Sequence, residues 1–190
     1  DTRDRNYTAY SIVGNSIDEG FEPAAEEVDY SKPRIPIKWE SHRGMRYDWL
    51  LIPLLPIDES HEKYSMDRVL VFEPPKQGRD YSAGIDTADG LNKEDEDRSV
   101  LNITQSAKGN FPDVQVAEFA SLRVNPPQMV GFAACLAAWY GPMCRDERGV
   151  KFCIEQRERP GDDCQFQLKL MGFTFHHDMV GYDGKVFKEQ

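Results

Sequence analysis

Regular hydrophobic patterning begins near residue 81 and predicts a run of strands. Residues 81–86 and 99–105 are rich in β-forming residues, and the polar loop between them predicts a hairpin. Residues 114–122 alternate apolar and polar positions after Pro112-Asp113, which predicts a third antiparallel strand. Together the three segments predict a meander.

A helical period follows the meander. Pro126-Pro127 suits the first turn of a helix, and apolar residues from Met129 to Tyr140 recur at helical spacing until Gly141-Pro142 ends the pattern. This segment predicts a helix packed on the sheet.

The next segments predict strand, helix and strand. Residues 150–155 form an apolar run typical of a strand buried on both faces, and residues 162–171 predict a helix ended by Gly172. A short strand is expected at 173–177. The right-handed crossover rule places the 150–155 strand parallel to and near the 81–86 strand. We therefore predict an α/β fold with a mixed sheet flanked by helices.

The first 75 residues differ from the rest because proline recurs and no helical period is sustained. We interpret residues 1–75 as an irregular, partly extended arm and residues 76–190 as the folded domain. Short strands are possible at 35–39, 47–55 and 69–73, the second with Pro53 at an edge or an end.

Composition narrows the class of protein. The 190 residues fit one domain, and no apolar run approaches the length of about 20 residues that a membrane span needs. The net charge of −10 argues against a protein that coats nucleic acid nonspecifically, although it leaves a nuclease open. The four cysteines form no Cys-x-x-Cys pair, and three of them lie among apolar neighbours in predicted helices or strands, which is typical of reduced core cysteines in an intracellular setting. We thus expect a soluble protein with no membrane partner.

Asp86 is the first candidate for chemistry because it ends an apolar strand. Small residues follow it at Thr87 and Ala88, and Gly90 lets the backbone turn. The alternative is a simple turn residue, which suits Asp89 better. We expect Asp86 to be partly buried, where an unpaired carboxylate is costly, and this favours a metal ligand.

Glu155 is the second candidate, at the end of the other apolar strand. It can instead pair with Arg157 or Arg159, but an exposed pair contributes only about 0–1 kcal/mol. Two acids at neighbouring strand ends can hold one or two Mg²⁺ or Mn²⁺ ions, one activating water and the other stabilising a leaving oxygen. That chemistry predicts hydrolysis of a phosphodiester.

Other polar motifs indicate less. His176 and His177 are adjacent on a strand and point to opposite faces, so at most one faces a given site. The acidic run 94–97 lacks the spacing of a calcium loop and is interpreted as a hairpin tip. The sequence contains neither a P-loop nor a Gly-x-Ser-x-Gly motif.

Several motifs taken together resemble the nuclease domain of the large terminase subunit of tailed bacteriophages, a member of the RNase H-like superfamily. The resemblance covers about residues 69–183. It rests on Phe72-Glu-Pro-Pro75, Tyr81-Ser-Ala-Gly-Ile-Asp86-Thr-Ala-Asp-Gly90, Glu96-Asp-Arg-Ser99-Val, Val114-Gln-Val-Ala-Glu118-Phe, Ile154-Glu155, Gly161-Asp-Asp163 and Leu170-Met-Gly-Phe173.

The resemblance implies an RNase H-like fold that cuts concatemeric viral DNA with two divalent metal ions and three acids. Asp86 and Glu155 correspond to the first and second acids. The family's third acid lies beyond the end of this chain, so Asp178 or Asp183 is a candidate substitute. The packaging ATPase is also absent, so residues 1–75 would be its tail, and the nuclease domain would be truncated.

The resemblance further implies double-stranded DNA, the portal protein and the small terminase subunit as partners, in the cytoplasm of a bacterial host. Lys151, Arg157 and Arg159 are the expected phosphate contacts. Two alternatives stay open: an RNase H-like module that docks on the packaging motor without cutting, and a resolvase-like or transposase-like nuclease.

Overall fold

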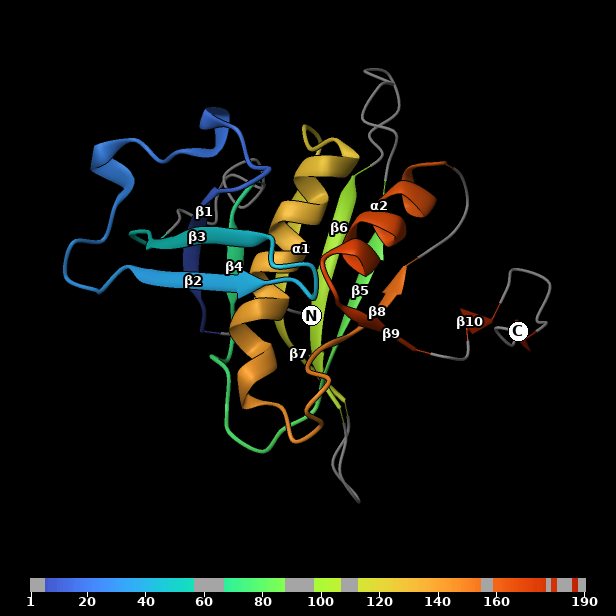
Figure 1. Ribbon diagram of the computed structural model, residues 1–190. Coiled ribbons are helices and arrows are strands. Elements are labelled where there is room, and N and C mark those ends of the chain that lie inside the picture. Colours follow the sequence, from blue (N-terminus) through green and yellow to red (C-terminus); the bar gives the residue numbers. More distant parts are fainter. Residues whose placement is uncertain are drawn as a thin grey trace.

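A computed structural model describes most of the chain, namely residues 6–56, 67–87, 98–106, 113–154, 159–176, 179–180 and 186–187. Within these residues, nine strands form one sheet in the order β2-β3-β1-β4-β7-β6-β5-β8-β9 (Figure 1). The strands are β1 Thr8–Gly14, β2 Ile35–Glu40, β3 Arg46–Pro53, β4 Val69–Val71, β5 Tyr81–Asp86, β6 Ser99–Gln105, β7 Val114–Ser121, β8 Lys151–Ile154 and β9 Thr174–Phe175.

The remaining elements connect or follow the sheet. They are the helices α1 Pro126–Tyr140 and α2 Arg159–Leu170, the 3-10 turns η2 Glu19–Phe21, η3 Ala25–Glu27 and η5 Gly141–Met143, and the pair β10 Met179–Val180 and β11 Val186–Phe187. In the described part of the chain, neither helix is long and apolar enough to cross a membrane.

The predicted meander and the parallel strands are confirmed. β5, β6 and β7 pair antiparallel in chain order, with Asp86 opposite Val100. β8 then pairs parallel to β5, and β9 pairs parallel to β8. The chain is therefore an α/β protein, and its described residues form a large mixed sheet flanked by two helices.

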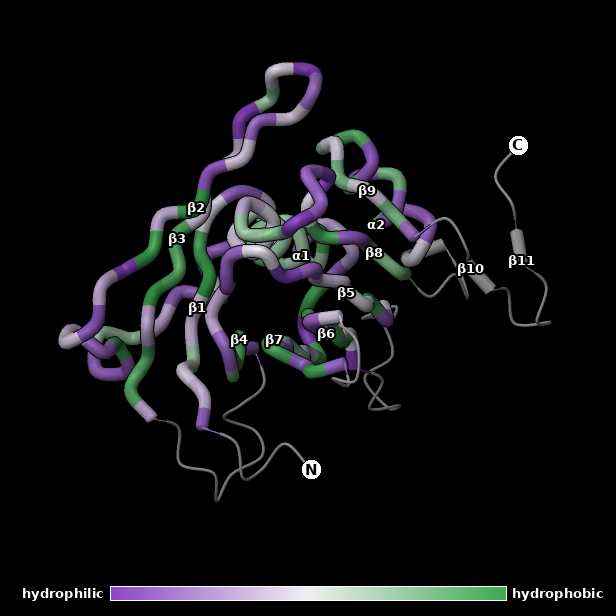
Figure 2. The backbone as a smooth tube through the Cα atoms, turned by 90° about the horizontal axis from the view of Figure 1, so that it is seen from below, coloured by the Kyte–Doolittle hydropathy of each residue, from purple (hydrophilic) through white to green (hydrophobic). Residues whose placement is uncertain are grey.

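α1 is the centre of the core. Twelve of its 15 residues are buried, which a helix that is apolar all round requires. The sheet curves around it, so that strands from both halves of the sheet face the helix (Figure 2). Gly131 lets the segment after β1 approach closely, because a Cβ there would lie 2.9 Å from Ile17 Cγ1.

The expectation of an irregular N-terminal arm is wrong. β1 pairs with both β3 and β4, and β4 pairs with β7, so the first 75 residues contribute four strands to the same sheet. The prolines do not prevent this. Pro53 is the last residue of β3, and Pro36 lies on β2, which ends the strand order and so tolerates a missing N–H donor.

The two ends of the sheet are joined across the helices. Trp39 on β2 stacks on Phe173, with ring centroids 4.5 Å apart, and its Nε1 donates to the Met171 carbonyl at 2.7 Å. The hairpin after β2 brings His42 against Gly172, where α2 ends with a positive φ of 90°. We call the contacts of Trp39 and His42 with residues 171–173 the clasp. The clasp ties the N-terminal strands to the last helix.

Candidate functional site

Asp86 lies at the carboxyl end of β5, as predicted, but its side chain is exposed. The expectation of a partly buried carboxylate is therefore wrong, because Ile85 is the last buried residue of the strand. In the parallel register, Ile85 pairs with Ile154 of β8. Glu155 is the next residue in the sequence, and it lies outside the described residues.

Two helices begin at the side of the sheet where β5 ends at Asp86. β7 leads into α1 and β8 leads into α2, so both helices start beyond strand carboxyl ends (Figure 1). The second turn of α2 touches the first residue of α1, since the Cys164 thiol donates to the Pro126 carbonyl at 3.5 Å. Carboxyl ends of strands and amino ends of helices are where α/β proteins commonly bind anionic ligands.

The side chain of Asp86 belongs to the face of β5 that points away from α1. Residues 81, 83 and 85 are buried, whereas Ser82 and Gly84 alternate with them on the other face. Register continues this second face through Asn102, Glu118 and Cys153 on the neighbouring strands. We call these residues, with Ser82, Gly84 and Asp86, the outer face.

The outer face carries polar side chains and is open at the middle of β5. A Cβ added at Gly84 would meet no atom within 4 Å, so the middle of β5 is open. The Gln115 amide donates to Asn102 Oδ1 at 2.6 Å and to Glu118 Oε2 at 2.9 Å. Cys153 is exposed between buried Phe152 and Ile154, which corrects the expectation that this strand is buried on both faces.

His176 also reaches the outer face. Its Nε2 lies 3.0 Å from Ser82 Oγ, at hydrogen-bonding distance, although β8 lies between β5 and β9 in the sheet. His177 lies outside the described residues. The pair is about four strand positions, or roughly 13 Å, from Asp86, which is too far to share one metal ion with it.

The structure describes one residue of the predicted metal site. Of the four predicted ligands, Asp86 is described, whereas Glu155, Asp178 and Asp183 lie outside the described residues. Among the described side chains, no three His, Cys, Asp or Glu residues form a group suited to a metal ion.

Of the three predicted phosphate contacts, the structure describes the side chain of Lys151 but not those of Arg157 and Arg159. Lys151 is the first residue of β8, and its Nζ forms an ion pair with Asp146 Oδ2 at 3.2 Å. Arg148 binds the same carboxylate through two nitrogens, and with Lys151 it lowers the pKa of Asp146 well below its usual value. Arg157 lies outside the described residues, and Arg159 opens α2 without a described side chain.

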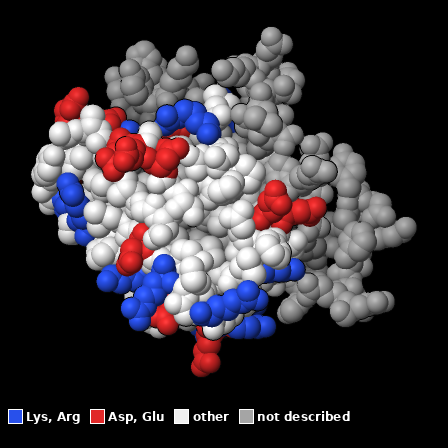
Figure 3. All heavy atoms as spheres, turned by 45° about the horizontal axis from the view of Figure 1, so that its top comes forward, with Lys and Arg blue, Asp and Glu red and all other residues white. Residues whose placement is uncertain are grey.

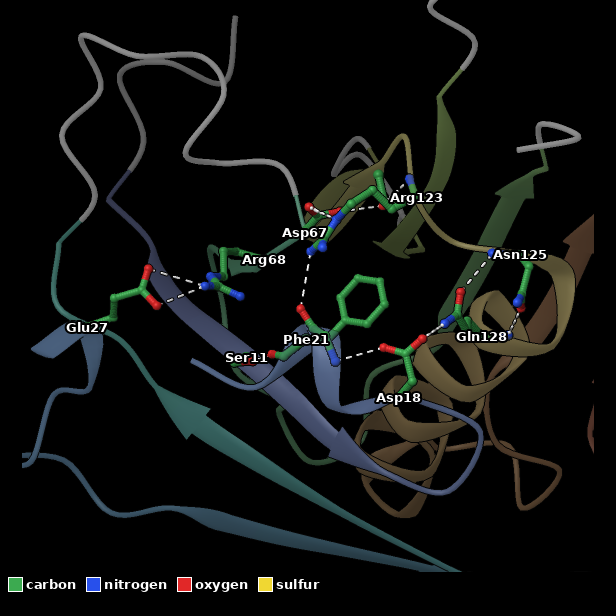
Figure 4. A network of polar contacts seen from close by, with 11 residues as sticks. Ser11, Asp18, Phe21, Glu27, Asp67, Arg68, Arg123, Asn125 and Gln128 are labelled. Carbon is green, nitrogen blue, oxygen red and sulfur yellow. Dashed lines mark hydrogen bonds and ion pairs between the residues drawn. The ribbon is translucent and has the colours of Figure 1, made fainter. Parts of the chain in front are cut away.

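A polar network fixes the start of α1 (Figure 4). Asn125 caps the helix by accepting from the Gln128 N–H at 3.0 Å. In return the Gln128 Oε1 accepts from the Asn125 N–H at 2.9 Å, and the Gln128 Nε2 donates to Asp18. Beside it, Arg123 donates to Asp67 at 2.8 Å and lies over the Phe21 ring at 4.9 Å. These contacts hold the segment after β1 against the connection from β7 to α1, on the same side of the sheet as Asp86.

Charge is distributed in small groups. On the face shown in Figure 3, the described Lys and Arg side chains form separate groups with Asp and Glu between them. This face therefore presents no continuous basic surface among the described residues.

Comparison with known proteins leaves the family open. No protein-family model matches the sequence, and no curated protein is significantly similar to it.

Proposed function

We propose that this chain is the metal-dependent DNA endonuclease domain of a viral genome-packaging terminase. The observation that carries the proposal is the parallel register of β5 and β8, in which Ile85 pairs with Ile154. Asp86 and Glu155 directly follow this pair in the sequence. Acids that follow paired residues of adjacent parallel strands suit a hard divalent cation, which prefers carboxylate oxygens.

The topology supports an RNase H-like fold. The resemblance implies an antiparallel meander followed by helix-linked parallel strands, and the order β7-β6-β5-β8-β9 has both parts. α1 connects the meander to β8, and α2 connects β8 to β9. The four N-terminal strands extend the sheet beyond β7, at the opposite side from β8.

In this proposal Asp86 and Glu155 hold the metal. A bound Mg²⁺ or Mn²⁺ supplies Lewis acidity and lowers the pKa of a coordinated water. The exposure of Asp86 fits this role because a duplex can reach the carboxylate without any rearrangement of the core. Ile85 and Ile154 are buried and fix the ends of β5 and β8, and Asp86 and Glu155 are the residues that follow them in the sequence.

The test is nicking and linearisation of a supercoiled plasmid in Mn²⁺, with EDTA as the metal-free control. We expect cutting by the wild-type chain and loss of at least about a hundredfold in rate for Asp86→Asn and Glu155→Gln, the range typical of lost electrostatic catalysis. Asp48→Asn is the matched control, because Asp48 is 68% exposed on β3, far along the sheet order.

Three results would count against the proposal. Unchanged cutting by Asp86→Asn would remove Asp86 from the site, and equal loss in Asp48→Asn would indicate a general effect on charge. Mn²⁺ binding by calorimetry without any cutting would instead favour the non-cutting docking module.

A further inference from the structure

Arg98 lies beside Asp86, although no motif pointed to it as a phosphate contact. It directly precedes β6, whose Val100 is the register partner of Asp86. Arg98 is exposed, Ser99 is buried and Val100 is half-buried, so the alternation of β6 extends back to Arg98. Arg98 therefore shares the outer face with Val100 and Asp86.

This position makes Arg98 a diagonal neighbour of Asp86. Residues at positions i and j−2 of an antiparallel pair lie about 7–8 Å apart, within reach of a long side chain. The other side chains around them on this face are small: Val100 opposite Asp86, Gly84 two positions back, and Ala120 on β7. The surface between Arg98 and Asp86 therefore carries no large side chain among these neighbours, and this leaves room for a ligand.

Arg98 also differs from most described cations in its partners. Nine Lys and Arg residues form ion pairs with acids: Lys32, Lys38, Arg46, Arg68, Lys76, Arg123, Arg145, Arg148 and Lys151. Within the described part of the chain, Arg98 has no such pair. Among the described side chains, no acid therefore competes with a ligand for its charge.

We propose that Arg98 is a phosphate-binding residue that holds the backbone of DNA next to Asp86. This inference rests on the proposed nuclease function and adds the cation that the site needs. A guanidinium binds phosphate through two parallel hydrogen bonds, and it offsets the repulsion between Asp86 and the approaching strand. Lys151 is less suited to this contact, because its ammonium is paired with Asp146 at the start of β8, whereas Asp86 lies beside the end of that strand.

The test separates binding from cutting. Affinity for a labelled duplex is measured by fluorescence anisotropy in Ca²⁺ at several salt concentrations, and plasmid cutting is measured in Mn²⁺. For Arg98→Gln we expect about tenfold weaker binding, the usual scale for a hydrogen bond to a charged group. The slope of log affinity against log salt should fall by about one, the signature of one lost phosphate contact.

Two variants complete the experiment. Arg98→Lys keeps the charge but not the bidentate geometry, so it should restore the salt slope and only part of the cutting rate. Arg46→Gln is the matched control, since Arg46 is 81% exposed on β3 and distant in the sheet order. Thermal unfolding of each variant should match the wild type, because Arg98 is exposed.

The outcomes distinguish this inference from the proposed function. If the wild type cuts DNA and Arg98→Gln binds with an unchanged salt slope, the role of Arg98 is refuted and the nuclease stands. If the wild type binds but does not cut, the nuclease proposal fails, and a reduced slope in Arg98→Gln still supports the DNA contact. A slope that falls equally in Arg46→Gln would overturn the assignment to Arg98.

Discussion

The clasp predicts that the N-terminal strands and the last helix unfold together. Trp39 is the residue to change, because its ring stacks on Phe173 at 4.5 Å and its indole N–H donates to Met171 at 2.7 Å. If the contact holds the ends of the sheet in place, removing it should destabilise the whole chain. If the N-terminal strands and α2 unfold independently, the loss of stability should be confined to the contact itself.

The magnitude follows from three contributions. The stacked pair is worth about 0.5–1.5 kcal/mol and the hydrogen bond about 0.5–1.5 kcal/mol. Trp39 is half-buried, so loss of its apolar contact adds less than the roughly 3–5 kcal/mol measured in total for fully buried large aromatics. We expect Trp39→Ala to lower the free energy of unfolding by about 3 kcal/mol. For a chain of this size that corresponds to roughly 6–12 °C in Tm.

The assay is urea unfolding followed by circular dichroism and by tryptophan fluorescence. Trp39→Phe keeps the ring but not the N–H donor, so its loss should be about 1 kcal/mol. Tyr30→Ala is the control, because Tyr30 is 71% exposed and should change stability by less than about 0.5 kcal/mol. A loss below about 1 kcal/mol for Trp39→Ala, close to that of Tyr30→Ala, would refute the coupling of the two ends.

Three further variants test the core and its charges. Gly131→Ala should destabilise by about 1 kcal/mol in urea unfolding despite its better helix propensity, since the new Cβ would lie 2.9 Å from Ile17 Cγ1. Burial raises the pKa of Cys164 to about 12. Its contribution to the free energy of unfolding is therefore fully present below the pKa of about 8.5 that the thiol has in the unfolded chain, and above that pH it falls by up to about 1.4 kcal/mol per pH unit. Cys164→Ala should flatten the fall of the urea midpoint between about pH 8.5 and 10. Arg148 lowers the pKa of Asp146, so that contribution is present above about pH 4 and is lost as the pH falls. Asp146→Asn should have a lower Tm than wild type at pH 7, and the gap should narrow towards pH 2.

The C-terminal half of the fold was predictable because its signals are local. The alternation in 114–122, the helical period after Pro126-Pro127 and the Gly172 stop each lie within a dozen or so residues. A chirality rule then sufficed to place β8 parallel to β5, which the structure confirms.

The N-terminal half was not predictable for the same reason in reverse. The pairing of β4 with β7 joins Leu70 to Glu118 across nearly 50 positions, and β1 is placed between β3 and β4. No local pattern specifies such partners. Frequent proline was interpreted as irregularity, whereas in the structure Pro36 and Pro53 occupy an end strand and a strand end, where a missing donor costs little.

For the candidate site, the place of Asp86 at the end of β5 is confirmed, whereas the expected burial of its side chain is wrong. The sequence favours a ligand role for Asp86 on the cost of burying a carboxylate, but the side chain is exposed, so burial does not distinguish a ligand from a turn residue. What now distinguishes the two is the surroundings: a parallel neighbour in register, two helix amino ends and an open position at Gly84. A turn residue requires none of these features. Arg98 adds a cation on the same face, and its effect on the salt dependence of binding tests whether these features serve a ligand.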